Sequence, residues 1–312
     1  MIVIENVSKQ FDKTLALDNV SMTVNDKSVF GLIGTNGAGK STLLRIISGI
    51  LRPGKGSVSV DGRTVFGHTE VSEEIFYISD DQFFFSNDTP GDMMRFYKGF
   101  YPMYDTGYYK SLVEYFELPV KNKIRTYSKG MKKQLFVALG LASGARYLLC
   151  DETFDGLDPL MREKVKGLLK RDMETRGLTP VIASHSLREL QDICDQMVML
   201  HKGGVVDLKE DLASASGEDI SLVTDGKVDD QVTKVHIIPK EGSRVDDPAD
   251  LEILSHTLDG RIHTMIVRGR EDEVMEKLRL QDPFFLESVP MTLEEMFIAG
   301  LGHRQGDEKN ED

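Results

Sequence analysis

The chain has 312 residues, of which 40% are hydrophobic and 29% are charged, and its formal net charge is −13. This size and composition predict one large folded domain plus a small one, and they exclude a chain that is disordered overall. The acidic balance argues against nonspecific binding to nucleic acid or anionic lipid, because both favour basic faces, although a local basic patch remains compatible with it.

The first elements predicted are strands and one helix. Residues 1–25 alternate apolar and polar side chains, which predicts half-buried strands of an antiparallel layer. Residues 29–33 form a short, continuous apolar run, which is typical of a central strand buried on both faces. A glycine-rich loop follows. Residues 43–50 then have helical spacing, and the Leu-Arg-Pro-Gly sequence at 51–54 ends that helix.

The middle of the chain alternates predicted helices with short buried strands. Residues from about 92 to 121 are expected to be helical, and residues 129–141 form a second, amphipathic helix. Apolar runs at 147–150 and 181–183 predict two further buried strands. Strands that alternate with helices indicate a mainly parallel α/β sheet.

The character of the sequence changes near residues 203–204. The polar stretch 214–219 is expected to be a linker or loop. Beyond it, short strands mix with helical stretches: strands at 235–238 and 265–267, helices at 272–280 and 292–299. We therefore predict that residues 206–312 form a small C-terminal α+β accessory domain, with a frayed polar tail.

The glycine-rich loop lies between the buried run at 29–33 and a helix. It and the start of that helix comprise Gly34, Thr35, Asn36, Gly37, Ala38, Gly39, Lys40, Ser41 and Thr42. In this context the pattern predicts a phosphate-binding loop rather than a chance match, because glycines let several N–H groups wrap a triphosphate. Lys40 is expected to reach the β- and γ-phosphates, and the Ser41 hydroxyl to ligate Mg²⁺. The predicted cofactors are ATP and Mg²⁺.

Polar residues follow the two later buried strands. Asp151 and Glu152 end the run at 147–150, and His185 follows the run at 181–183. The carboxyl ends of strands form the ligand crevice of α/β sheets, so these side chains should face the phosphate loop. Asp151 is expected to hold Mg²⁺ through water, and Glu152 to orient or deprotonate the attacking water. A neutral His185 could donate a hydrogen bond to the γ-phosphate. The alternatives are an ordinary acidic loop and a structural histidine.

A third motif lies shortly before the Asp151 strand: Tyr-Ser-Lys-Gly-Met at 127–131, followed by Gln134. With the two motifs above, it makes residues 1–205 resemble the nucleotide-binding domain of ABC transporters. The resemblance implies a P-loop NTPase fold of ABC type, with a parallel core sheet, an antiparallel β subdomain and a helical subdomain. It also implies that Ser128 and Gly130 contact the γ-phosphate held by a second ATP-binding subunit, identical or different. Ser128 is equally expected to be an N-cap.

Three other positions match the family. Phe11 stands where the family has an aromatic that stacks on adenine, with a core aromatic as the alternative. The Gly-Leu-Asp sequence at 156–158 resembles the D-loop, so Asp158 is expected to take part in communication across the dimer. His185 matches the family's switch histidine.

The sequence also departs from the family pattern. The replacements are Tyr127 for leucine, Lys129 for glycine, Met131 for glutamine and Thr153 for proline. The family's Q-loop glutamine would align near Asp80 of this sequence, and Gln82 lies two positions after it. We assign Asp80 as the side chain that senses Mg²⁺ and the permease.

The segment 83–104 is rich in aromatic residues, namely Phe83, Phe84, Phe85, Phe96, Tyr97, Phe100, Tyr101 and Tyr104. In the family this helical subdomain carries the groove that receives a helix of the integral membrane permease, and aromatics suit an interface core. A packed subdomain core is the alternative. Residues 100–105, 127–131 and 291–297 resemble a branch of bacterial exporter-type systems with a separate permease, often tied to drug or peptide-antibiotic resistance.

The cellular compartment follows from several absences. Cys150 and Cys194 lie in apolar segments without disulfide or metal spacing, which is typical of a reducing compartment. No run of 18 apolar residues is present, and residues 1–5 lack a signal-peptide pattern. We expect a cytoplasmic protein that associates peripherally with the membrane through the permease.

These observations predict the ATP-binding and ATP-hydrolysing subunit of an ABC transporter, with export as the direction. The alternative is a soluble ABC ATPase that acts on nucleic acid or ribosomes. Such relatives usually carry two nucleotide domains or a long coiled coil, which this sequence lacks, and no nucleic-acid partner is expected. A phosphate-loop kinase leaves residues 127–131 and Asp158 unexplained.

Overall fold

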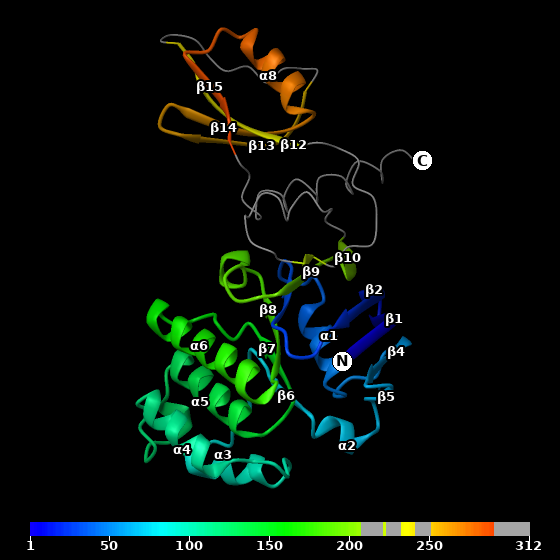
Figure 1. Cartoon of the computed structure of the whole chain (residues 1–312), viewed down its shortest axis with the longest axis vertical. Coiled ribbons are helices and arrows are strands. Elements are labelled where there is room, and N and C mark those ends of the chain that lie inside the picture. Colours follow the sequence, from blue (N-terminus) through cyan, green and yellow to red (C-terminus); the bar gives the residue numbers. More distant parts are fainter. Residues whose placement is uncertain (207–220, 223–231, 241–250, 290–312) are drawn as a thin grey trace. The chain divides into compact units, whose positions relative to one another are not determined.

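The computed structural model describes residues 1–206, 221–222, 232–240 and 251–289 (Figure 1). The chain forms two compact units. The first comprises Met1–Val206 and strand β11 (Ser221–Leu222), and the second contains the described residues from Val232 onward. Among the described residues, no helix is both long enough and apolar enough to cross a membrane.

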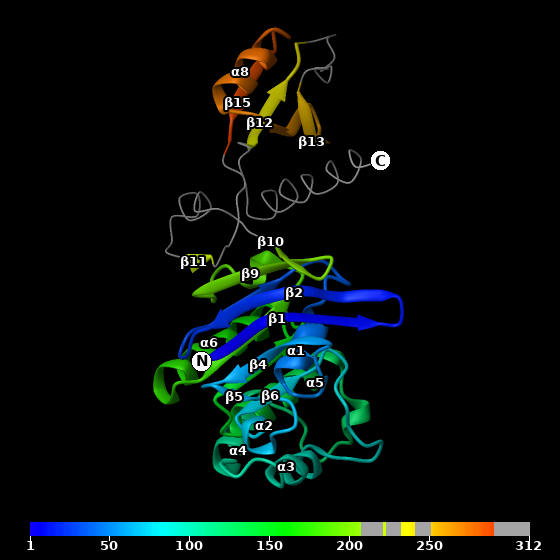
Figure 2. The same cartoon turned by 90° about the vertical axis from the view of Figure 1, so that its right-hand side faces the viewer.

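An antiparallel layer begins the first unit. Its strands are β1 (Ile2–Phe11), β2 (Thr14–Val24), β4 (Lys55–Val60) and β5 (Arg63–Thr64), in the order β2-β1-β4-β5. Figure 2 shows the long β1–β2 hairpin across the front of this unit. Ile2, Ile4 and Val7 of β1 are buried, whereas Glu5 and Asn6 between the last two are exposed. The prediction of half-buried antiparallel strands in the first 25 residues is confirmed.

The second sheet has the order β10-β9-β3-β8-β7-β6, with β11 also paired to β9. The strands are β3 (Phe30–Ile33), β6 (Ile75–Ile78), β7 (Tyr147–Asp151), β8 (Thr179–Ser184), β9 (Gln196–His201) and β10 (Gly204–Val206). All pairs are parallel except β9–β10. Every residue of β3, β7 and β8 is buried, as predicted for central strands.

The register of this sheet positions the candidate site. Ile33 pairs with Ser184, and Asp151 pairs with Ala183. The carboxyl ends of β3, β7 and β8 therefore lie at the same edge, and the loops that follow them meet there.

Helices cover both faces of the parallel sheet. Figure 1 shows α1 (Lys40–Ile47) on one side and α5 (Lys129–Ala142) and α6 (Pro159–Arg176) on the other. Successive residues of β7 point to opposite faces. Leu149 belongs to the core cluster shared with α1 and the antiparallel layer, whereas Leu148 packs closely against Gly140 of α5.

The predicted helix over 92–121 is wrong in its extent, because the structure has two helices there. They are α3 (Pro90–Lys98) and α4 (Thr106–Tyr115). Pro102 lies between them, and proline both lacks an N–H donor and disfavours helical backbone in the residue before it. Asp105 then starts α4 as an N-cap, accepting a hydrogen bond from Tyr108 N at 2.8 Å. Short elements complete the unit: α2 (Thr69–Ser72), η1 (Ile124–Thr126) and η2 (Leu187–Glu189).

The second unit is an antiparallel sheet with one described helix. The strands are β12 (Val232–Ile238), β13 (Glu252–Asp259), β14 (Ile262–Arg268) and β15 (Phe285–Ser288), in the order β13-β14-β12-β15. Helix α8 (Glu271–Arg279) packs Val274 and Leu278 against the sheet's core. The predicted strands at 235–238 and 265–267 fall within β12 and β14. The predicted linker at 214–219, the helix at 292–299 and the motif at 291–297 lie outside the described residues.

Candidate functional site

The loop between β3 and α1 is shaped by close approaches of the main chain. A Cβ at Gly34 would lie 2.3 Å from the carbonyl oxygen of Leu200. Gly39 has a φ of 106°, and a Cβ there would lie 2.6 Å from the carbonyl oxygen of Ala16. Glycine is required at both positions. The remaining loop residues are Thr35, Asn36, Gly37 and Ala38, and Thr42 lies in the first turn of α1. The N–H groups at this helix start have no partners within the helix and can face an anion.

Lys40 carries the positive charge of this loop. Its side chain is buried, and Nζ donates to the carbonyl oxygens of Gly34 at 2.6 Å and Thr35 at 3.3 Å. The same Nζ lies 3.2 Å from Oε1 of Glu152. The loop, its lysine and one of the two predicted acids are thus in direct contact.

Asp151, the other acid, is joined to the same helix. The Ser41 hydroxyl donates to Asp151 Oδ1 at 3.0 Å, and the Tyr77 hydroxyl donates to Oδ2 at 2.8 Å. Burial raises the pKa of Asp151, while the hydrogen bonds from Tyr77 and Ser41 oppose that shift. Ser41 and Asp151 present adjacent oxygen ligands, which is the donor type that Mg²⁺ prefers.

Glu152 lies immediately after β7 in a left-handed conformation, with a φ of 47°. Its N–H donates to the carbonyl oxygen of Ala183 at 3.0 Å. Its carboxylate lies between the Lys40 ammonium and the His185 imidazole. Oε1 is near Lys40 Nζ, and Oε2 is 2.8 Å from Nδ1 of His185. This is the reach expected of a group that accepts or directs a proton at a phosphate site.

The start of α5 presents a further set of predicted residues. Ser128 is the N-cap, and its hydroxyl accepts a hydrogen bond from Met131 N at 3.2 Å, which confirms the predicted cap. A Cβ at Gly130 would lie 3.0 Å from the carbonyl oxygen of Gly156, so the helix start packs closely on the turn after Glu152.

Three comparisons with known proteins agree. The family model described as ABC transporter matches residues 17–155. The ABC transporter ATP-binding protein YtrB of Bacillus subtilis is 28% identical over 305 residues, which is 98% of this chain and 99% of YtrB. The uncharacterized ABC transporter ATP-binding protein YdbJ of the same organism is 30% identical over 208 residues, covering 65% of this chain and 67% of YdbJ. This chain belongs to the ABC transporter ATP-binding proteins.

The fold agrees with this assignment. A solved dimeric structure of a bacterial ABC transporter cassette superposes with a TM-score of 0.60 at 23% identity, covering 66% of this chain and 96% of the cassette. The predicted ABC-type P-loop fold is confirmed. The chain is an ATP-binding subunit of an ABC transporter and an ATPase.

In this ABC ATPase, Lys129 replaces the usual signature glycine and pairs with an acid of the turn after Glu152. Its Nζ lies 2.6 Å from Oδ2 of Asp155, and its methylene stem passes over Gly156. The hydrogen bond between the two side chains raises the pKa of Lys129 and lowers the pKa of Asp155. The lysine at this position therefore introduces a positive charge, which Asp155 of the same chain neutralises.

Asp158 and Phe11, two other residues predicted to act at the nucleotide site, lie at the ends of secondary-structure elements. Asp158 is the N-cap of α6, with Oδ1 accepting from Met161 N at 3.0 Å. Phe11 ends β1 with 44% of its surface exposed, so the alternative of a core aromatic is wrong. In the described part of the chain, no hydrogen bond joins Ser128 or Asp158 to the phosphate loop. The nucleotide roles of all three residues stay predictions.

Asp80 follows β6 at the same sheet edge. Its Oδ1 lies 3.0 Å from Nζ of Lys133, and that Nζ also donates to the carbonyl oxygen of Glu152. Gln82, the displaced glutamine, is buried and donates to the carbonyl oxygen of Ser79 at 3.0 Å. The role of Asp80 as a Mg²⁺ and permease sensor stays a prediction.

Sequence reasoning missed two side chains of this site, Tyr77 and Lys133. Tyr77 carries the only polar side-chain group of strand Ile75–Ile78, and Lys133 lies on the buried face of α5 beside Gln134. A polar residue at a position that the pattern marks as buried is a signal that could have identified both, because such groups need partners.

The aromatic-rich segment divides into two sets. Phe76 is fully buried, and the rings of Tyr97 and Tyr101 lie against it at centroid distances of 5.0 and 5.3 Å. A second set, the exposed aromatic cluster, comprises Phe83, Phe85, Phe96 and Phe100, which are 39% to 64% exposed. Rings within it touch one another at centroid distances of 5.0 to 5.8 Å. The packed-core alternative therefore holds for Tyr97 and Tyr101, while the permease contact of the exposed aromatic cluster stays a prediction.

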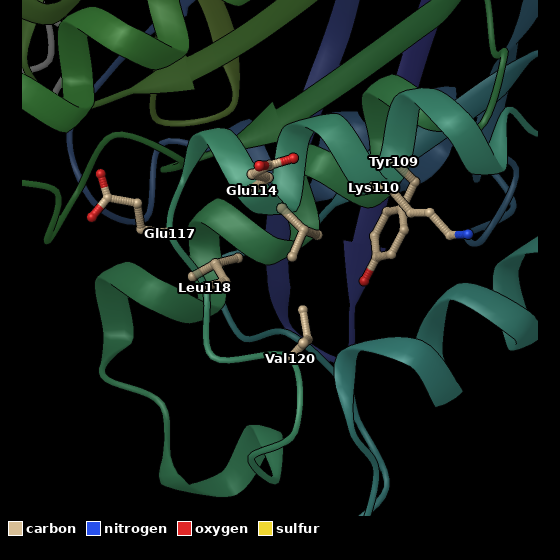
Figure 3. Close-up of a pocket in the computed structure, with 7 residues that line it drawn as sticks. Tyr109, Lys110, Glu114, Glu117, Leu118 and Val120 are labelled. Carbon is tan, nitrogen blue, oxygen red and sulfur yellow. The ribbon is translucent and has the colours of Figure 1, made fainter.

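A separate hollow of about 540 Å³ lies along α4. Figure 3 shows Tyr109, Leu118 and Val120 around it, together with Glu114 and Lys110. None of its lining residues belongs to the phosphate loop or to the acids after β7, so the hollow is distinct from the nucleotide site.

Proposed function

We propose that this ATP-binding subunit works as one half of a face-to-face pair and drives a separate membrane permease by binding and hydrolysing MgATP. One observation carries the proposal: Lys40 lies 3.2 Å from Glu152, and Ser41 lies 3.0 Å from Asp151. A phosphate-holding loop and the two acids needed for metal binding and water activation therefore share one sheet edge.

Within one subunit, the N–H groups of residues 34–42 and the Lys40 ammonium would hold the phosphates, and Phe11 would stack on adenine. Ser41, Asp151 and Asp80 would hold Mg²⁺, which neutralises charge on the β- and γ-phosphates when bound.

The attacking water would be handled at the same edge. Glu152 would orient the water and accept its proton, and His185 would hold the Glu152 carboxylate and donate to the γ-phosphate. Both residues follow buried strands, which bring them to the same sheet edge.

The second subunit would complete the site. Ser128 and Gly130 lie at the start of a 14-residue helix, where N–H groups and the helix dipole favour an anion. We place the γ-phosphate of the partner there, with Asp158 at the contact between subunits. ATP would then join the two copies, and hydrolysis would release them. The dimeric cassette with the same fold supports this arrangement.

The permease would dock on the exposed aromatic cluster, since exposed aromatic side chains suit the core of an interface. This contact would hold the subunit at the cytoplasmic face of the membrane. Residues 206–312 would act as an accessory domain. The resemblance of residues 100–105 and 127–131 to exporter-type systems supports export.

The test uses Glu152→Gln, which should bind ATP normally but turn it over about 10² to 10⁴ times more slowly. ATP-bound pairs should then accumulate, and light scattering should report a dimer with MgATP but a monomer with ADP. Adding Ser128→Arg should abolish that dimer, because a bulky side chain fills the site of the partner's γ-phosphate. Normal turnover by Glu152→Gln would remove Glu152 from its role, and a dimer unaffected by Ser128→Arg would contradict the cross-subunit site.

A further inference from the structure

Lys133 is a lysine with no exposed surface in α5, whose other buried residues, apart from Gln134, are apolar. Lysine is almost never fully buried without a partner, because an ammonium that loses its water in a protein interior is strongly destabilised. Here the Nζ has two partners: the carboxylate of Asp80 at 3.0 Å and the carbonyl oxygen of Glu152. The Asp80 side chain is half exposed, so one partner of this ion pair is in contact with solvent and the other is buried.

The contact with Glu152 falls on a peptide in an unfavourable conformation. A glutamate with a φ of 47° lies in the left-handed region, which is unfavourable for a residue with a Cβ. Such a conformation persists only where the surroundings fix it. The N–H of Glu152 donates to the carbonyl oxygen of Ala183 at 3.0 Å. Its own carbonyl oxygen accepts from the Lys133 ammonium and, at 3.2 Å, from the N–H of Asp155.

The backbone conformation decides where the Glu152 carboxylate points. With this φ, Oε1 lies 3.2 Å from Lys40 and Oε2 lies 2.8 Å from His185. If the carbonyl oxygen of Glu152 lost the Lys133 ammonium, only the hydrogen bond from the N–H of Asp155 would remain, and the peptide could relax toward a commoner conformation. The carboxylate would then move away from the phosphate loop, although nothing in that loop had changed.

We propose that Lys133 is a positioning residue for ATP hydrolysis: it holds the main chain of Glu152 so that the carboxylate faces Lys40 and His185, with Asp80 as its counter-charge. This inference rests on the proposed role of Glu152. It predicts that Lys133 affects turnover only through Glu152 and leaves nucleotide binding unchanged.

The experiment is a double-mutant cycle on the full chain, with steady-state hydrolysis of MgATP as the readout. Lys133→Met keeps the aliphatic stem and removes the donor. It should lower kcat about tenfold or more, while KM for ATP changes less than about threefold. In the Glu152→Gln background, Lys133→Met should lower the residual turnover by less than about twofold, because the group that Lys133 positions is already disabled.

Lys166→Met is the matched control. Lys166 is also a buried lysine in an ion pair, with Nζ 2.6 Å from Asp192, but it makes no contact with Glu152. It should lower the melting temperature, as Lys133→Met does, without lowering kcat. If Lys133→Met does not fold, Lys133→Gln, which keeps a shorter neutral donor, replaces it in the cycle. It should give a smaller fall of about threefold, which also disappears in Glu152→Gln.

Two results would overturn the inference: an unchanged kcat in Lys133→Met, or an equal fall in both backgrounds, which would make Lys133 act independently of Glu152. Failure of the underlying function is recognised separately, because Glu152→Gln by itself would then turn over ATP at the normal rate.

Discussion

The candidate nucleotide site has two sides in this chain, and they are built differently. On the phosphate-loop side, residues 34–42 and 151–152 are set by the main chain, where buried parallel strands end and glycines permit close approaches. On the signature side, residues 127–134 and 155–158 are set by side chains, through caps at helix starts and lysines paired with acids.

The two sides also differ in how closely they follow the family pattern. The phosphate loop keeps its glycines, because a Cβ at Gly34 or Gly39 would collide with carbonyl oxygens. The signature departs from the pattern at Lys129, and the new charge is matched by Asp155. Where the main chain forms the site, a replacement has no local remedy. Where side chains form it, a second side chain can compensate for the first.

The largest effect is expected at Lys40, whose ammonium adds a charged side chain to the phosphate-loop side. Lys40→Gln removes the ammonium that faces the phosphates, so kcat/KM for ATP should fall about 10²-fold or more. Steady-state hydrolysis and ATP binding by calorimetry would measure this. Lys55→Gln, an exposed lysine on β4, serves as the control and should leave both unchanged. Near-normal activity in Lys40→Gln would remove Lys40 from its proposed role and sharpen the contrast, because the phosphate-loop side would then depend on its main chain alone.

A smaller effect is expected from Tyr77→Phe. The Tyr77 hydroxyl donates to Asp151, so its loss leaves one oxygen of the proposed Mg²⁺ ligand without its donor. The Mg²⁺ concentration for half-maximal hydrolysis should rise about tenfold at saturating ATP. Tyr104→Phe is the matched control, since the buried Tyr104 hydroxyl has no hydrogen-bond partner within the described residues. Equal Mg²⁺ requirements in the two variants would mean that Tyr77 only packs.

The smallest effect is expected on stability at the signature side. Lys129 and Asp155 are both partly exposed, so Lys129→Gln should lower the free energy of unfolding by no more than about 1 kcal/mol. Because the pair lowers the pKa of Asp155 in the folded chain, its stabilisation is present above the unfolded pKa of about 4 and is lost as the pH falls through the lower folded value.

Urea denaturation at neutral pH and near pH 3, about one unit below the ordinary aspartate pKa, would measure this difference. The gap between parent and Lys129→Gln should shrink at the lower pH and in high salt. A gap that grows on acidification would show that the Lys129–Asp155 pair is not its source.

Much of the site could be predicted because it consists of local patterns at strand ends. Gly34, Asp151 and His185 each follow an apolar run, and a parallel sheet brings such ends to one edge. The contacts of Tyr77 with Asp151 and of Lys133 with Asp80 join residues 74 and 53 positions apart. No local pattern specifies such pairs, because they depend on how helices and strands pack.

The error in the fold has a different, local cause. The helix predicted over 92–121 overlooked Pro102, although its effect on the chain is local and could have been inferred. The N-cap role of Asp105 could be predicted only once the break between α3 and α4 had been placed. The nucleotide roles of Ser128, Asp158 and Phe11 concern bound nucleotide or a second subunit, so they stay predictions.

The two native thiols have a practical consequence for cross-linking. Cys150 and Cys194 are free and buried, and burial raises the pKa of the Cys150 thiol to about 12 and raises that of Cys194 as well. Neither should form a reactive thiolate near neutral pH. A cysteine introduced at an exposed position outside the candidate site, such as Lys55 of β4, would therefore be the thiol that a maleimide labels, without prior removal of the natural ones. The distance between the two copies could then be followed through the ATP cycle by spectroscopy on the otherwise unaltered chain.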